Sequence, residues 1–309
     1  MGLGRPRLWL LSKALWRADS AGGMAGGHYP AVSHGAHGLS KGGRALKGTT
    51  KNRWKVVGQD IVLSWKDARW GLGIGALLFA AAAMQYQASL GPAADVQIVP
   101  TLADYITFAF AGSHPFENGS GTPFLLPVTW FALVFFCEHS CAIFPDRMMR
   151  GMGINRLIQA GSRLRWWRRL TFLVILWSAA YLMLGLLCMV AMGIIRYGIC
   201  QAGAVQMDLI CMVFLTLCVL SELQAVCSAL ASPIVGELAI TVLMVCTAFW
   251  DQPVLWPRYA MLLRSGAMGM DGFSPVGASA YLAFSFLLLF SLGTLLFQKS
   301  NILSPNKVR

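Results

Sequence analysis

Six long apolar segments follow one another along the chain after residue 69. Each is close to the ~20 residues that an α-helix needs to cross ~30 Å of hydrocarbon, and few charged residues interrupt them. In lipid, a helix satisfies its own backbone hydrogen bonds, whereas an isolated strand does not. The pattern therefore predicts an all-α, polytopic membrane protein with six transmembrane helices, at about 70–89, 124–144, 170–195, 209–230, 233–250 and 278–297.

A different pattern precedes the first span. In residues 52–69, large apolar residues recur at spacings of three and four, at Trp54, Val57, Ile61 and Trp65. Most charged residues of this stretch lie elsewhere around the helix, as in an amphipathic helix in the membrane interface. We therefore expect an interfacial helix over 52–69, a transmembrane domain over 70–300 and a cytoplasmic tail over 301–309.

Residues 1–51 are rich in Gly and Ala and carry several basic residues, so they offer little apolar surface to bury. We expect a flexible tail, in which the first turns can form a short basic amphipathic helix at the membrane surface. An Arg-rich, acid-poor start is also typical of an organellar presequence, and that alternative stays open.

Charge is distributed unevenly between the two sides of the predicted membrane. The chain is 56% hydrophobic and has 25 Lys and Arg against 13 Asp and Glu. All but three basic residues fall before the first span, in the loop 145–169 or after the last span; the exceptions are Arg196, Arg258 and Arg264. The positive-inside rule then places both termini in the cytoplasm. The membrane that we expect is the plasma (inner) membrane of the cell. The sequence contains no nucleic-acid-binding motif. We therefore expect the excess of basic residues to contact lipid headgroups rather than nucleic acid.

Three acids lie within the apolar segments, at Glu138, Glu222 and Glu237. A carboxylate in hydrocarbon is costly, so each is expected to face the bundle interior, a partner or water. Each is a candidate functional residue. The alternative is structural: Glu138 can reach Arg147 or Arg150, and Glu222 and Glu237 flank the short turn near Pro233.

Metal and nucleotide sites are not predicted within the chain. Cys137 and Cys141 share a helical face, but His139 projects elsewhere, so core packing explains this cluster better than a metal. Residues 43–48 resemble a phosphate-binding loop only superficially, because the required Gly-Lys-Ser/Thr is missing. We expect no bound cofactor and no enzymatic activity of the chain itself.

The loop 145–169 is the most distinctive stretch. It combines seven arginines with glycines at 151, 153 and 161 and with apolar residues spaced as in a short amphipathic helix. Positive-inside charge explains the arginines but not this alternation. We therefore favour a protein-docking role, in which the residues of interest are Gly153, Leu157, Ile158, Gly161, Ser162, Arg163, Arg165, Trp166 and Trp167.

This loop resembles the "G-x-x-x-L-I-x-x-G-S-R-x-x-W-W" pattern of small bacterial permeases of the ABC-2 type transporter family. The resemblance extends over about residues 52–303. It includes the segments 101–104, 110–112, 126–130, 259–265 and 301–303.

The resemblance implies a half-transporter with six helices after an interfacial helix. The loop 145–169 would carry the coupling helix that docks on a separate cytoplasmic ATPase, so that ATP acts through a partner subunit. Arg163 and Arg165 would pair with acids of that ATPase, or with Asp60 or Asp67. A second permease half, identical or different, would complete the pathway, and export of an amphipathic or apolar substrate is expected. On the outer face, a partly re-entrant segment is expected around Trp256, Leu263 and Arg264.

Two other classes of protein fit the same pattern. A non-transporting membrane scaffold or assembly factor of a secretion or conjugation system would use the basic loop only for docking. An intramembrane enzyme would need catalytic groups clustered across helices, and Glu138, His139, Glu222 and Glu237 are the only material for one. A stoichiometric ATPase stimulated by this chain would distinguish the permease from both.

Overall fold

The computed structural model describes residues 50–90, 99–114, 126–150, 162–201, 207–266 and 272–299. The chain divides into two units, Met1–Lys47 and Gly48–Arg309, and every described residue belongs to the second unit. Residues 1–49 of the predicted tail therefore lie outside the described residues, as does the predicted tail over 301–309.

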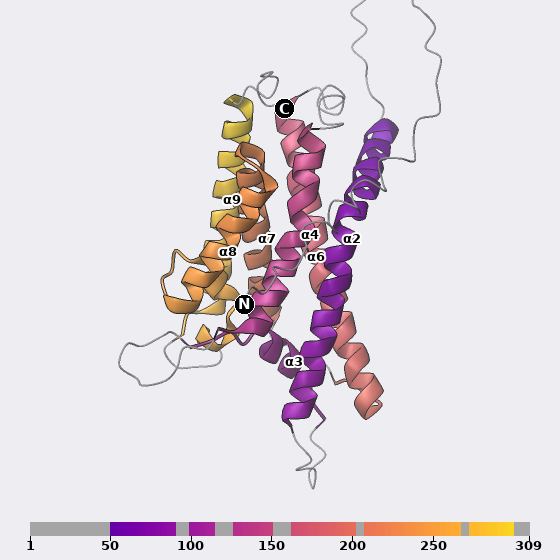
Figure 1. Cartoon of the computed structure of the whole chain (residues 1–309), viewed down its shortest axis with the longest axis vertical. Coiled ribbons are helices and arrows are strands. Elements are labelled where there is room, and N and C mark those ends of the chain that lie inside the picture. The colour runs from indigo at the N-terminus through magenta and orange to yellow at the C-terminus, as the bar shows by residue number, and fades with distance from the viewer. Residues whose placement is uncertain are drawn as a thin grey trace, which may run out of the picture. The chain divides into compact units, whose positions relative to one another are not determined.

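The second unit is a bundle of α-helices, and the part of the chain that the structure describes contains no strand (Figure 1). This confirms the all-α fold class. The elements in chain order are α2 (Thr50–Ser89), α3 (Leu102–Ala109), α4 (Val128–Arg150), α6 (Arg163–Tyr197), α7 (Met207–Leu230), α8 (Pro233–Phe249), the 3₁₀ turns η1 (Trp256–Ala260) and η2 (Leu262–Arg264), and α9 (Pro275–Lys299).

Five helices are long and apolar enough to cross a membrane: α2 from Val57, α4 up to Pro145, α6, α7 and α9 up to Gln298. These are the predicted spans one to four and six, with altered ends. The predicted fifth span is the helix α8, which has 17 residues and so extends only about 26 Å at 1.5 Å per residue. The described helices therefore have the length and composition of a membrane protein, and a sixth complete span stays a prediction.

The predicted interfacial helix and first span form one continuous helix of 40 residues, α2. No break in the helix separates the two predicted ranges, 52–69 and 70–89. The glycines of α2 after Trp70 allow close packing against neighbouring helices. A Cβ atom at Gly71 would overlap Ser140 of α4, and one at Gly75 would overlap the Tyr181 ring of α6, whereas Gly73 faces open space. This Gly-x-x-x-Gly spacing lets the neighbouring helices approach α2 closely.

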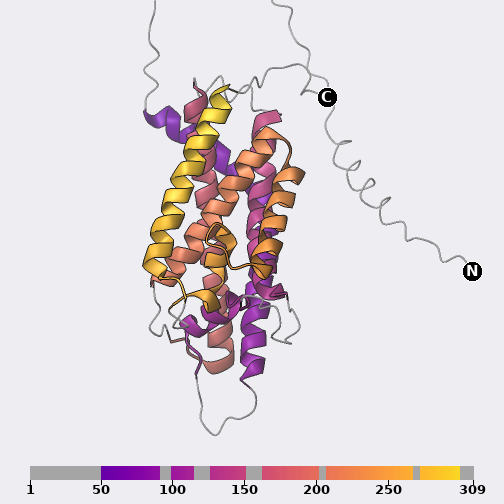
Figure 2. The same ribbon diagram turned by 90° about the vertical axis from the view of Figure 1, so that its left-hand side faces the viewer.

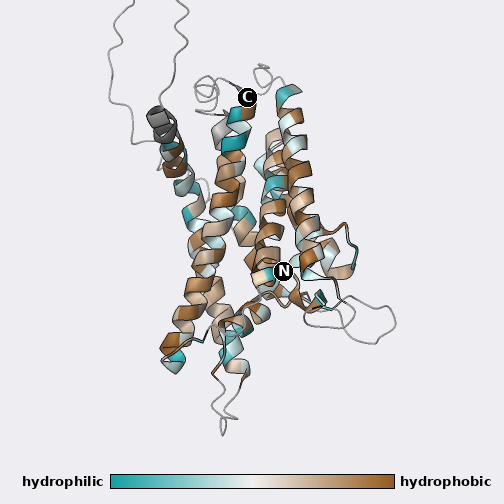
Figure 3. Cartoon of the chain, turned by 180° about the vertical axis from the view of Figure 1, so that it is seen from behind, coloured by the Kyte–Doolittle hydropathy of each residue, from teal (hydrophilic) through white to brown (hydrophobic). Residues whose placement is uncertain are grey.

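The bundle has two chemically different ends. We call one the basic end: there α2 begins, α4 ends, α6 begins and α9 ends (Figure 2). The other end, which we call the α3 end, holds α3 and the two 3₁₀ turns. Hydrophobic residues cover the helices between the two ends (Figure 3).

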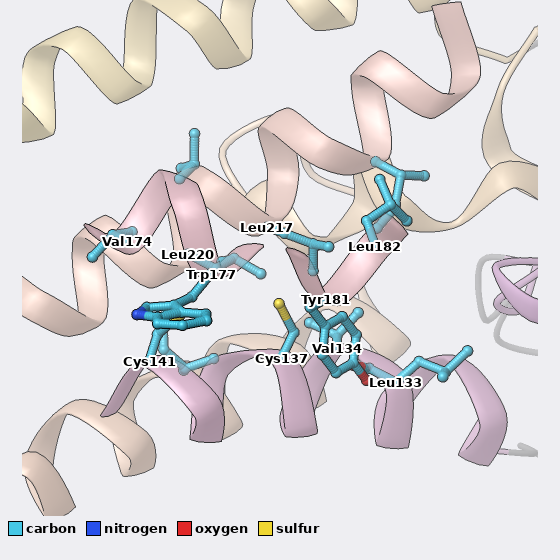
Figure 4. Packing of buried hydrophobic residues seen from close by; sticks show 14 of the residues in the cluster. Leu133, Val134, Cys137, Cys141, Val174, Trp177, Tyr181, Leu182, Leu217 and Leu220 are labelled. Carbon is cyan, nitrogen blue, oxygen red and sulfur yellow. The ribbon is translucent and has the colours of Figure 1, made fainter. Parts of the chain in front are cut away.

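The core lies where α4, α6 and α7 meet. Cys137 and Cys141 of α4 face Trp177 and Tyr181 of α6 and the leucines of α7 (Figure 4). Both cysteines are buried there among apolar side chains. The indole N–H of Trp177 also donates to Ser64 Oγ of α2 over 3.0 Å, and this bond ties α2 to the core.

Candidate functional site

The first turn of α6 lies within the predicted docking loop 145–169, because this helix begins at Arg163. Ser162 is its N-cap, and its Oγ accepts hydrogen bonds from the backbone N–H of Arg165 at 3.3 Å and from Arg165 Nε at 3.0 Å. This turn contains no acid, although acids stabilise the positive end of a helix dipole and arginines do not. Helix stability therefore does not explain the arginines, which leaves membrane topology or contact with a partner as the reason for them.

Arg163 contacts the end of α9. Its Nη1 donates to the backbone carbonyls of Gln298 at 2.7 Å and Phe297 at 3.4 Å, and so binds carbonyl groups that a helix end leaves without partners. Arg165 and Arg168 are instead exposed, and the Nε bond from Arg165 to Ser162 stays within the same helix end. Of the arginines singled out in the sequence, Arg163 thus acts within the fold, and Arg165 is available to a partner.

The two tryptophans of the motif are buried between α6 and α9. The Trp166 ring stacks on Phe297 with centroids 4.6 Å apart, and Trp167 lies 5.7 Å from the same ring. Gly293 of α9 allows this contact, since a Cβ atom there would overlap the Trp167 ring. The beginning of α6 is therefore fixed to the end of α9.

The remaining motif residues, Gly153, Leu157, Ile158 and Gly161, lie outside the described residues. The predicted coupling helix therefore stays a prediction. The described chain does show where this loop attaches: to the last turn of α4 at Arg150 and to the clamped first turn of α6 at Ser162.

Glu138 of α4 lies in the interior, 2% exposed. Ser221 Oγ of α7 donates to Glu138 Oε1 at 3.2 Å. The carboxamide of Gln224, with its nitrogen toward α4, donates to Glu138 Oε2 at 3.1 Å and to the Glu138 carbonyl at 3.0 Å. Glu138 thus joins α4 to α7 through two donors, rather than reaching toward the end of its own helix.

Glu222 of α7 is also fully buried. Its Oε1 accepts a hydrogen bond from Thr171 Oγ1 of α6 at 3.0 Å. Its Oε2 and the Nε1 of Trp167 interact with each other and make no other hydrogen bond. The carboxyl group lies close to the tryptophan that the motif places at the basic end, although 55 positions separate them in sequence.

Glu237 of α8 pairs with His139 of α4. The Nδ1 and Oε1 atoms are 2.8 Å apart, and both side chains are partly exposed. The sequence placed His139 on another face of its helix than Cys137 and Cys141, and it placed Glu237 near the turn at Pro233. The structure brings the two side chains together as a hydrogen-bonded pair between two helices.

The predicted re-entrant segment is folded back against the α3 end. The backbone N–H of Leu262 donates to the Phe110 carbonyl at 2.7 Å, and that of Leu263 to the Ala111 carbonyl at 3.0 Å. Gly112 follows with φ of +74°, a left-handed conformation that favours glycine. Two of the segments that carry the family resemblance, 110–112 and 259–265, therefore pair with each other.

Arg264 holds this segment in place. Its guanidinium donates to the carbonyls of Thr247 at 2.9 Å and Ala248 at 3.3 Å in the last turn of α8, and to the Ser113 carbonyl at 2.8 Å. It also lies 3.4 Å from the Asp251 carboxylate. Burial lowers the pKa of Arg264 from its ordinary value, and the Asp251 carboxylate opposes this shift. Trp256 is partly buried in the turn preceding this residue.

No family model, curated protein or solved structure matches this chain.

Three partners at these sites were not found from the sequence: Gln224, Phe297 and the pairing of His139 with Glu237. Each contact joins residues at least 86 positions apart, so the spacing of residues along the sequence does not predict it. A polar residue in an apolar segment is a signal of interior position, and Gln224 carries that signal.

Proposed function

We propose that the chain is the membrane-spanning half of an ATP-driven transporter of the ABC-2 type, coupled through its loop 145–169 to a separate cytoplasmic ATPase. The sequence resemblance over 52–303 suggests this function. The all-helical bundle, with five helices long and apolar enough to cross a membrane, is compatible with a membrane subunit, and the sixth span of the proposal would be the shorter helix α8. In this proposal the protein lies in the plasma membrane with its basic end facing the cytoplasm, and it exports an amphipathic or apolar substrate.

The observation that carries the proposal is the contact between Trp166 and Phe297, with Arg163 beside it. A docking loop transmits motion only if the helix that follows it is rigidly joined to the rest of the bundle. Here the first turn of α6 is bound to the last turn of α9 by ring stacking and by hydrogen bonds to helix-end carbonyls. Closure of an ATPase against the loop would therefore move α6 and α9 together.

The exposed arginines of that turn are the best probes of docking. Reversing Arg163 would disturb its bonds to α9, so loss of the ATPase in that variant would have two explanations. Arg165 and Arg168 are exposed, and reversing both to Glu changes the charge without removing a contact between helices. The matched control is Arg196→Glu, because Arg196 is an exposed arginine of the same helix at its other end.

The experiment is co-purification of the chain with the ATPase subunit encoded in its own genome, followed by measurement of ATP hydrolysis. We expect wild type and Arg196→Glu to retain a stoichiometric ATPase, and Arg165→Glu/Arg168→Glu to lose most of it while inserting normally. If the double variant keeps both complex and hydrolysis, the docking assignment fails. If an ATPase binds but neither hydrolysis nor substrate movement depends on the chain, the scaffold alternative replaces the permease.

A further inference from the structure

A narrow crevice lies at the basic end, between α6, α7 and α9. It has a volume of about 220 Å³, including the part open to solvent at its mouth. Apart from Gly293, the residues that line it are apolar or aromatic: Trp167, Val226, Ala229, Leu230, Leu296 and Phe297. Leu230 is 47% exposed, so the crevice reaches the surface of the bundle. Its volume equals about seven water molecules at ~30 Å³ each, which suits a slender alkyl chain better than a bulky molecule.

The buried acid Glu222 adjoins the inner end of this crevice. Four residues share one face of α7, within an arc of about 100° on an ideal helix: Glu222, Val226, Ala229 and Leu230. Glu222 is one turn, about 6 Å, farther from the basic end than Val226. Trp167 lines the crevice, and its Nε1 interacts with Oε2 of Glu222. The same indole therefore connects the apolar crevice with the carboxyl group.

The contacts of Glu222 are those of a carboxylate without a counter-ion. Its Oε1 accepts a hydrogen bond from Thr171 Oγ1 at 3.0 Å, and its Oε2 faces the indole N–H of Trp167, which can only donate. Among the described residues, no positively charged side chain contacts it. A buried charge is costly unless a group of opposite charge compensates it, so a cation is the group that this site lacks.

We propose that the crevice binds an alkylammonium ion, whose chain lies between α7 and α9 and whose charged nitrogen reaches Glu222 beside the ring of Trp167. Apolar walls with a carboxylate at the inner end are complementary to a slender apolar chain with a cationic end. The indole contributes as well, because the face of a tryptophan ring attracts a cation. The tail of a lipid fits the same walls but has no group that pairs with the carboxylate.

An alkylammonium ion is also a substrate class for the transporter, and in that role it rests on the proposed function. The binding itself needs no ATPase. It is tested with octylamine, which is protonated at neutral pH, and with octanol, which has a chain of the same length and no charge.

The binding site is located by photolabelling. An octylamine analogue with a diazirine at the end of its chain is added to the full chain in liposomes and activated with light, and mass spectrometry identifies the labelled residues. Octylamine and octanol then compete with the label at equal concentrations in the membrane. We expect labels on crevice residues of α7 and α9, and competition by octylamine about tenfold stronger than by octanol, the effect of one hydrogen bond to a charged group.

A matched pair of substitutions tests the charge. Glu222→Gln keeps an acceptor for Thr171 and removes the charge, so we expect about tenfold weaker competition by octylamine and unchanged competition by octanol. Glu138→Gln is the control and should change neither. Glu138 is also buried, but its hydrogen bonds go to Ser221 and Gln224 rather than to a residue that lines the crevice.

Equal competition by octylamine and octanol would overturn the proposal and leave an apolar crevice that a lipid tail fills. Unchanged competition by octylamine in Glu222→Gln, or labels confined to residues outside the crevice, would overturn it as well. Ala229→Phe fills the crevice, so labelling of Leu230 and Leu296 should disappear, and full labelling would refute the site. The proposed function fails separately: loss of ATPase docking with octylamine still bound refutes the transporter and leaves this site intact.

Discussion

The indole of Trp166 lies flat on the phenyl ring of Phe297, with the ring planes 6° apart and the centroids separated by 4.6 Å. The two residues are 131 positions apart in sequence and belong to the first turn of α6 and the last turns of α9. Because Trp166 belongs to the part of the predicted docking loop 145–169 that forms the first turn of α6, this contact joins that loop directly to a second helix of the bundle.

Removing the ring of Phe297 tests that contact. Phe297→Ala deletes the stacking partner of Trp166 and opens space beside Trp167, and we expect a loss of about 2 kcal/mol in unfolding free energy. In detergent this is measured as a lower midpoint of thermal unfolding. Phe284→Ala is the control, because Phe284 belongs to the same helix and is 64% exposed. Equal losses in both variants would show that the stacking contributes nothing of its own.

The close approach of α2 to its neighbours predicts a contrast between two glycines. In Gly75→Ala, the added methyl group meets the buried Tyr181 ring, whose hydroxyl donates to the Leu133 carbonyl at 2.8 Å. Overpacking of this kind costs about 1–3 kcal/mol, against a gain of up to about 1 kcal/mol in helix propensity. Gly73→Ala, two residues away in open space, has only the gain. Thermal unfolding should therefore rank the proteins Gly73→Ala, wild type and Gly75→Ala, and the reverse order would contradict the packing.

The sequence predicted the helices well and the contacts between them poorly. Apolar length alone located α4, α6, α7 and α9, because a span must be long enough to cross the membrane and the connections are polar. It did not predict that α2 continues through Trp70, since an amphipathic stretch and an apolar stretch can belong to one helix. It also located α8, predicted at 233–250 and found at Pro233–Phe249, but not the contacts at its ends, the cap at Ser232 and the binding of its last carbonyls by Arg264.

The candidate site was predictable residue by residue but not as an arrangement. Glu138, Glu222 and Glu237 were singled out because acids are rare in apolar segments, and the structure separates them into two different environments. Glu138 and Glu222 are fully buried and bonded to Ser221 and Thr171, whereas Glu237 reaches the surface with His139. Helix rotation decides between these environments, and rotation follows from packing over the whole bundle rather than from local sequence.

Arg264 predicts a strong effect at the α3 end. Arg264→Lys keeps the charge but cannot place several donors in one plane, so the carbonyls of Thr247, Ala248 and Ser113 lose partners. We expect a loss of about 3 kcal/mol and faster proteolysis within residues 251–266. Arg196→Lys, an exposed position at the same end, is the control. Unchanged proteolysis in Arg264→Lys would mean that the backbone bonds from Leu262 and Leu263 hold the segment without it.

The buried acid Glu138 predicts that an amide and an apolar side chain at its position have different effects on stability. In Glu138→Gln, the amide oxygen still accepts a hydrogen bond from Ser221 or Gln224, whereas Glu138→Leu removes the side-chain acceptor of both and leaves Gln224 only the backbone carbonyl of residue 138. We expect the Leu variant to be about 2–4 kcal/mol less stable than the Gln variant.

Glu222→Gln retains the acceptor for Thr171, so this variant should assemble normally. It should change only transport, if the carboxyl group of Glu222 takes part in transport. Thermal unfolding of all three variants, with ATP hydrolysis and efflux measured on the two Gln variants, separates these roles. Normal efflux in Glu222→Gln would make its carboxyl group a structural link between α6 and α7, and equal stability of Glu138→Leu and Glu138→Gln would show that the link between α4 and α7 depends on packing alone.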